Sequence, residues 1–174
     1  MKAALAPIDG GAVRLRLLTA ADLPMTLAWR NRDEVRRWFK FSEVLPPLQH
    51  RQWFDRYAEE DGNYVWIVEQ SANGEPVGQV SLYRLDRRKG EAEVGRFIAA
   101  PGCEGRGYMK AAILALKRWA FEALSLTRLH LEVFADNLRA IALYERCGFT
   151  AVRGDAQFLT MECRTVESAS GATA

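Results

Sequence analysis

A glycine-containing segment in the second half of the chain has residue types suited to holding a phosphate group. It runs from Glu91 to Lys110 as EAEVGRFIAAPGCEGRGYMK, which predicts a strand, a loop and the start of a helix. Such a loop turns several backbone N–H groups toward one point, and the helix dipole adds about half a positive charge there. Gly105 and Gly107 allow a ligand to approach the backbone closely. The segment therefore predicts a phosphate or pyrophosphate site.

The same residues disfavour a dinucleotide fingerprint and do not form a P-loop. Lys110 stands where a dinucleotide fingerprint has its third glycine, and the strands before the loop form a meander instead of a βαβ unit. No Gly-Lys-Ser or Gly-Lys-Thr follows, so the segment is not a P-loop. Taken alone, it also fits a plain structural turn.

The hydrophobic pattern predicts the elements around this segment, with strands at period two and helices at helical spacing. The expected strands are residues 13–18, 64–69, 76–83, 91–99, 128–134, 149–152 and 158–163, and the expected helices are 19–31, 33–39, 47–61, 107–124 and 137–146. The three strands from 64 to 99 form an antiparallel meander joined by turns at Asn73-Gly74 and Asp86–Gly90.

Length, composition and charge fit one globular domain without a nucleic-acid or membrane partner. The chain has 174 residues, of which 49% are hydrophobic and 26% charged, enough to bury a core without metal or disulfide. Lys and Arg total 24 against 22 Asp and Glu, and this net charge of +2 is too small to indicate binding to nucleic acid or an anionic membrane. We expect an N-terminal extension at 1–12, one domain at 13–164 and a disordered tail at 165–174.

The cysteine and histidine content predicts a reduced, metal-free protein. The three cysteines form no C-x-x-C pair, and the two histidines, His50 and His130, lie at no metal-binding spacing. Pro7, Asp9 and two glycines interrupt the N-terminal segment where a signal peptide would be continuously apolar, and no run approaches the roughly 18 apolar residues of a membrane span. A cytoplasmic location is therefore expected.

A second segment, residues 131–149, completes a pattern that resembles the GCN5-related N-acetyltransferase superfamily. The resemblance rests on the G-R-G-Y-M loop followed by Asn137, Ala140, Tyr144 and Gly148-Phe149, and it covers about residues 13–163. It implies an α+β (α/β) fold with a mixed, twisted central sheet flanked by helices. The sheet would splay open between strands 91–99 and 128–134. Acetyl-coenzyme A would be the cosubstrate and lie in that opening.

The resemblance also implies which residues bind the coenzyme. Its pantetheine arm would follow strand 91–99, and its pyrophosphate would bind backbone N–H groups of the loop. The expected contacts are Phe97, Ile98, Ala99, Gly105, Arg106, Gly107, Tyr108, Met109, Lys110 and Asn137. Glu104 stands where the family usually has Gln or Arg, so we expect its side chain to point to solvent.

Direct acetyl transfer to an amine needs an unprotonated amine, donors for the developing oxyanion and a proton for the departing thiolate. Tyr144 is the expected acid, because superfamily members place a tyrosine from this helix beside the sulfur and a phenol with a pKa near ~10 is protonated. Glu132 precedes Tyr144 by twelve residues, a spacing similar to that in ribosomal-protein alanine acetyltransferases. Glu132 is the first candidate base, with Glu93 or a water chain as alternatives. His130 is expected to pack on the sheet, and no cysteine nucleophile is expected.

The expected acceptor is a small-molecule amine. Residues 27–39, LAWRNRDEVRRWF, resemble a pattern in acetyltransferases that act on nucleotide-linked amino sugars. Arginines suit a diphosphate and aromatic rings suit a base, so Trp29 and Arg30, with Glu93, are expected at the acceptor site. The alternatives are a ribosomal-protein N-terminus, a polyamine, and a non-catalytic coenzyme A sensor. A monomer or homodimer is expected.

Overall fold

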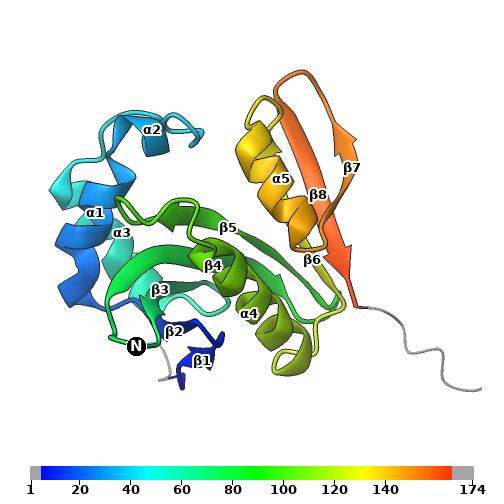
Figure 1. Ribbon diagram of the computed structural model, residues 1–174, viewed down its shortest axis with the longest axis horizontal. Coiled ribbons are helices and arrows are strands. Elements are labelled where there is room, and N and C mark those ends of the chain that lie inside the picture. Colours follow the sequence, from blue (N-terminus) through cyan, green and yellow to red (C-terminus); the bar gives the residue numbers. More distant parts are fainter. Residues whose placement is uncertain (1–4, 166–174) are drawn as a thin grey trace, which may run out of the picture.

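The computed structural model describes residues 5–165, so residues 1–4 and nearly all of the tail expected at 165–174 lie outside it. Within the described residues, the strands form one eight-stranded sheet in the order β1-β2-β3-β4-β5-β6-β8-β7 (Figure 1). Every neighbouring pair is antiparallel except β5 and β6, which are parallel. This mixed, helix-flanked sheet confirms the expected fold class.

The elements follow the predicted order with small differences. The strands are β1 (Ile8–Asp9), β2 (Val13–Leu17), β3 (Tyr64–Gln70), β4 (Pro76–Asp86), β5 (Glu91–Ala99), β6 (Arg128–Phe134), β7 (Thr150–Gly154) and β8 (Phe158–Arg164). The helices are a short 3₁₀ turn, η1 (Ala20–Asp22), then α1 (Leu23–Arg30), α2 (Asp33–Arg36), α3 (Pro47–Glu59), α4 (Tyr108–Glu122) and α5 (Leu138–Arg146). The sequence did not predict β1, because a strand of two residues shows no alternation.

Opposite faces of the sheet pack against different helices. Along β3, Trp66 and Val68 belong to the main core, which includes α4, whereas Val65 and Ile67 pack with Tyr57 of α3. This alternation is the period-two pattern of a strand that is buried on both faces. The apolar side of α5 joins the same core as α4, so α4 and α5 lie on one side of the sheet.

The sheet opens between β5 and β6. The two strands pair only over Glu91–Glu93 and Arg128–His130, and Figure 1 shows them diverging, with α5 and the β7–β8 hairpin beyond the opening. On its other edge, β5 has an irregular register between Ser81↔Gly95 and Gln79↔Ile98, and Arg96 takes φ 52° there. This is a β-bulge, which bends the strand locally. The splay between strands 91–99 and 128–134 is therefore confirmed.

Membrane-spanning helices and metal-binding clusters are both absent from the described residues. No helix within residues 5–165 is long and apolar enough to cross a membrane. The same residues contain no group of His, Cys, Asp and Glu side chains placed to hold a metal ion.

Candidate active site

A cavity of about 960 Å³ fills the opening between β5 and β6. Its walls come from both strands, the start of α4, one side of α5, and the segment 32–41 that includes α2. Because α4 and α5 lie on one side of the sheet and α2 on the other, the cavity has two distinct sides. We call them the α4 side and the α2 side.

The loop before α4 exposes backbone at the α4 side. Gly107 is the N-cap of α4 with φ 83° and offers no capping side chain, and Gly105 has φ 76°. A Cβ atom added at either glycine would meet no atom within 4 Å. The first-turn N–H groups of a helix have no partner within the helix, so this end can bind an anion.

The side chains of this loop separate into two groups. Gly105, Gly107, Met109 and Lys110 line the cavity. Tyr108 instead donates its hydroxyl hydrogen bond to Gln70 Oε1 at 2.9 Å, and Arg106 is exposed outside the cavity lining. In this structure neither the Tyr108 nor the Arg106 side chain lines the cavity.

Glu104 corrects one expectation. Its carboxylate lines the cavity and accepts a hydrogen bond from Arg32 Nη1 at 3.0 Å instead of pointing to solvent. Arg32 also donates to the carbonyl oxygen of Ala99. Although partial burial opposes it, hydrogen bonding that includes Arg32 keeps the pKa of Glu104 below its usual value. The guanidinium neutralises a carboxylate that would otherwise repel a phosphate.

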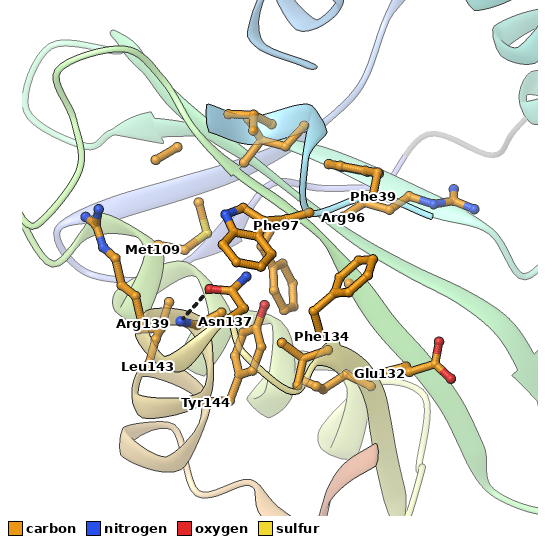
Figure 2. Close-up of a pocket in the computed structure, with 18 of the residues that line it drawn as sticks. Phe39, Arg96, Phe97, Met109, Glu132, Phe134, Asn137, Arg139, Leu143 and Tyr144 are labelled. Carbon is orange, nitrogen blue, oxygen red and sulfur yellow. Dashed lines mark hydrogen bonds between the residues drawn. The ribbon is translucent and has the colours of Figure 1, made fainter. Parts of the chain in front are cut away.

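Tyr144 of α5 lines the cavity beside β5. Its ring is 5.6 Å from that of Phe97 on β5, centroid to centroid, and Figure 2 shows its hydroxyl directed into the cavity. Burial, with smaller contributions from Tyr83 and Cys147, raises the pKa of Tyr144 above its usual value. The phenol is therefore protonated at neutral pH and can donate a proton.

Asn137 and the backbone of β5 frame the rest of the α4 side. Asn137 caps α5, with Oδ1 accepting from the Ala140 N–H at 3.2 Å, and also lines the cavity (Figure 2). Phe97, Ile98 and Ala99 line it from β5. The side chain of Ile98 is buried on the opposite face beside Trp29, so it is the backbone of Ile98 that is available to the cavity.

A polar cluster surrounds Glu93 where β5 and β6 begin to separate. Its carboxylate accepts hydrogen bonds from the Tyr83 hydroxyl at 3.1 Å and from Arg84 Nη1 at 2.7 Å, and its side chain is only 12% exposed. His130 Nε2 lies 4.0 Å from the same carboxylate. Burial and the charge of Arg128 lower the pKa of His130, against an opposing effect of Glu93. His130 is thus neutral at pH 7 and lines the cavity next to a carboxylate.

Glu132 lies further along β6 on the α2 side. Its carboxylate pairs with Lys40, whose ammonium also lies 4.8 Å from the centroid of the Phe158 ring. Trp38 approaches Phe134 in the same region, with ring centroids 6.0 Å apart. Figure 2 shows the Glu132 carboxylate pointing away from the Tyr144 hydroxyl. The two residues expected to act together are thus on different parts of the cavity wall.

Trp29 and Arg30 do not line the cavity, and this corrects their expected place at the acceptor. Trp29 is 6% exposed and packs with Ile98 and Ala100. The Arg30 guanidinium lies 3.9 Å from the Phe39 ring centroid and donates to the carbonyl oxygen of Phe41. Both residues are therefore part of the packing beneath the α2 side.

The pattern that suggested a nucleotide sugar has a structural explanation. Asn31 exchanges two hydrogen bonds with the backbone of Leu45, at 2.8 and 2.9 Å, and Arg36 donates to the carbonyl oxygen of Ser42. Together with Arg30, these side chains hold the loop after α2. The loop in turn places residues 38–41 against the cavity.

The three cysteines lie in packed positions of the fold. Cys147 is 1% exposed, and burial raises the pKa of its thiol. Cys103 lines the cavity but packs beside Trp29, Ile98 and Ala100, and all three cysteines are unpaired thiols. A direct transfer does not need them.

Sequence reasoning missed several residues on the α2 side. Tyr83, Lys40, Phe134 and Phe158 all line the cavity, yet they come from four separate elements or loops. The bulge at Arg96 was also missed. Alternation along residues 76–83 and 128–134 places Tyr83 and Phe134 on a strand face, but only the assembled sheet shows that these faces meet.

Comparison with known proteins agrees with this geometry. A family model described as an acetyltransferase (GNAT) domain matches residues 12–150. The chain is 27% identical to an aminoglycoside N(6')-acetyltransferase type 1 of Klebsiella pneumoniae, over 79% of this chain and 74% of that protein. It is 28% identical to a spermidine N(1)-acetyltransferase of Vibrio cholerae, over 68% and 67%.

A solved structure shares the fold. The crystal structure of spermidine N-acetyltransferase from Vibrio cholerae in complex with CoA and spermine superposes with a TM-score of 0.78 and 22% identity. The match covers 88% of this chain and 95% of that one.

Proposed function

Because the chain belongs to the GNAT acetyltransferase family, we propose that it transfers the acetyl group of acetyl-coenzyme A directly to a primary amine of a polyamine-type cation. The observation that carries the proposal is the opening of the sheet beyond Glu93, with the glycine-capped end of α4 and the Tyr144 hydroxyl facing the same cavity. The opening gives a thioester and an amine access to each other from opposite sides of the sheet.

The α4 side fits the coenzyme. The backbone N–H groups of residues 105–110 would hold the pyrophosphate, since the two glycines leave room for it and the helix end favours negative charge. Lys110, Arg139 and Arg146 line this side and add positive charge. The backbone of Phe97–Ala99, which lacks a strand partner on the β6 side, would bind the pantetheine amides.

In the proposed reaction the amine nitrogen forms a bond to the acetyl carbon, and the carbon–sulfur bond breaks. Backbone N–H groups beside the bulge at Arg96 would stabilise the oxyanion. Tyr144 would give its proton to the departing thiolate, and Glu93 would take the proton of the amine directly or through water. Solvent then restores both groups to their starting protonation states.

The contacts favour Glu93 over Glu132 as the proton acceptor. Glu93 lies where the strands part, and it accepts a hydrogen bond from Tyr83, which lines the same cavity as Tyr144. Glu132 is paired with Lys40 and directed away from Tyr144. We therefore assign Glu132 to binding of the acceptor and not to proton transfer.

The choice of acceptor rests on the relatives and on the α2 side. Both sequence relatives quoted above are named for acceptors that carry several amines. Carboxylates of Glu93 and Glu132 and the rings of Trp38 and Phe134 line the α2 side, and both kinds of group attract ammonium ions. The nucleotide-sugar interpretation loses two of its residues, because Trp29 and Arg30 are occupied in packing.

An acceptor panel tests this proposal. Thiol release from acetyl-coenzyme A is measured with spermidine, an aminoglycoside, an N-terminal alanine peptide and a nucleotide amino sugar. The proposal predicts the highest kcat/KM for spermidine or the aminoglycoside. Preference for the peptide or the sugar would overturn the acceptor assignment. Tight coenzyme binding with no turnover of any amine would instead support the sensor.

A further inference from the structure

The ammonium group of Lys40 already occupies a place built for an ammonium ion. It pairs with the Glu132 carboxylate and lies 4.8 Å from the centroid of the Phe158 ring. A carboxylate beside an aromatic face is the combination that recognises alkylammonium groups. The two partners come from β6 and β8, whereas Lys40 comes from the loop after α2, so the contact crosses the cavity opening.

Lys40 can leave this place readily. Its side chain is 68% exposed and that of Glu132 is 37% exposed, and exposed ion pairs are weak and exchange with other cations. The aliphatic part of the Lys40 side chain is flexible, whereas the backbone of Glu132 and Phe158 is held by the pairing of β6 with β8. The carboxylate and the ring therefore form the permanent part of the site.

The distance of Glu132 from Glu93 along the sheet suits an acceptor with two amines. Glu132 is two residues beyond His130 on the same face of β6, and His130 pairs in register with Glu93. Two residues of extended strand span about 7 Å. That spacing is similar to the separation of the two nitrogens of a short diamine, so an amine near Glu93 would bring its second ammonium toward Glu132.

We propose that Glu132 and Phe158 form a subsite for the second ammonium of the acceptor, and that Lys40 fills it in the absence of acceptor. This inference rests on the proposed polyamine acceptor and adds a residue that sets acceptor preference. A polyamine must displace the Lys40 ammonium to bind, whereas a monoamine need not. Lys40 thereby weakens polyamine binding relative to monoamine binding.

The test compares Lys40→Met with a matched control, Lys89→Met. Lys89 is 70% exposed and pairs with Asp86 in the turn before β5, outside the cavity lining. Initial rates of thiol release are measured with spermidine and with n-propylamine at saturating acetyl-coenzyme A. Lys40→Met should lower the KM for spermidine by about three- to tenfold and leave that for n-propylamine unchanged. Lys89→Met should change neither.

A binding measurement separates this inference from the proposed function. Spermidine is titrated calorimetrically into each protein saturated with coenzyme A, where no turnover occurs, and Lys40→Met should bind it about three- to tenfold more tightly. Adding Glu132→Gln should abolish that gain. Suppose that the wild type acetylates spermidine while Lys40→Met leaves the KM and the affinity for spermidine unchanged, or changes the KM values for spermidine and n-propylamine equally. Either result would overturn the subsite and leave the proposed acceptor standing. If neither protein binds spermidine, the proposed acceptor fails too.

Discussion

On the α4 side of the cavity the functional groups belong mainly to the backbone, whereas on the α2 side they belong to side chains. The α4 side offers the N-terminus of α4, two glycines with positive φ and the unpaired edge of β5. The α2 side offers charged and aromatic groups from β4, β5, β6, β8 and the loop after α2. Every carboxylate that we place there, Glu93 and Glu132, already has a cationic partner.

The contrast indicates where specificity resides. A site made of backbone groups tolerates changes of side chain. Glu104 is an example, because it stands in the loop before α4 with its charge paired to Arg32. A site made of side chains can change its acceptor through single substitutions. We therefore expect substitutions on the α2 side to alter which amine reacts, and backbone changes on the α4 side to alter coenzyme binding.

The largest effect is expected for Tyr144, which we propose to protonate the thiol and not to bind the acceptor. Tyr144→Phe removes the proton donor, so kcat should fall by about 10²- to 10⁴-fold with every amine, while coenzyme A affinity stays unchanged. The control is Tyr57→Phe, which removes a hydroxyl buried under α3 and should keep kcat. Steady-state rates and calorimetry measure both quantities. A near-normal kcat for Tyr144→Phe would remove the assigned acid.

The next effect sharpens the choice between the two carboxylates of the α2 side. Glu93→Gln should lower kcat by about 10²-fold, because the amine loses its proton acceptor. Glu132→Gln should instead raise the KM for spermidine with little change in kcat. Rates across pH 6 to 9 with spermidine as acceptor distinguish the two variants. The reverse result, a kcat loss confined to Glu132→Gln, would restore Glu132 as the base.

A smaller effect tests the backbone character of the α4 side. Gly107→Ala places a Cβ in a left-handed conformation at the N-cap of α4, which costs about 1–2 kcal/mol and disturbs the N–H groups there. The KM for acetyl-coenzyme A should rise by roughly five- to tenfold. Gly74→Ala is matched, since Gly74 has φ 74° and the same open surroundings in the β3–β4 turn. Gly74→Ala should lower the melting temperature as much as Gly107→Ala does and leave the KM for acetyl-coenzyme A unchanged. Equal KM values for the two variants would contradict coenzyme binding at the start of α4.

The smallest expected effect concerns the packing that supports the α2 side. Burial and the nearby charge of Arg30 lower the pKa of His50, whose ring stacks on Trp53 and whose Nε2 is 3.1 Å from the Thr26 hydroxyl. The His50 imidazole therefore binds a proton more readily in the unfolded chain than in the folded protein. The free energy of unfolding should fall as pH drops below about 6.5. Urea unfolding between pH 7.5 and 5.5 measures the slope.

His50→Gln should reduce this slope without removing it, because burial lowers the pKa of His130 as well. Comparing slopes instead of absolute stabilities corrects for the packing lost in the variant. An unchanged slope in His50→Gln would show that His50 does not titrate as described.

The two sides of the cavity also differ in how far the sequence predicts them. The loop and helix start at 105–110 depend on local glycines and a change of hydrophobic period, which the sequence shows directly. The opening between strands 91–99 and 128–134 is expected only from the family resemblance. The cavity wall on the α2 side depends on tertiary contacts. Trp29 and Arg30 read as ligand residues because an amphipathic helix shows residue types but not which face the core covers.

Glu132 illustrates the same limit at a single position. Alternation along β6 places it correctly on the face of His130 and Phe134. Its partner, Lys40, is distant in sequence and reaches it only through a loop held by Arg30, Asn31 and Arg36. No local pattern specifies that contact.

A crystal structure of the protein with coenzyme A bound tests the central claim most directly. We predict the coenzyme between β5 and β6, its diphosphate within hydrogen-bond distance of the backbone N–H groups of residues 105–110, and its sulfur beside the Tyr144 hydroxyl. A diphosphate bound anywhere else, or a thiol remote from Tyr144, would contradict this account.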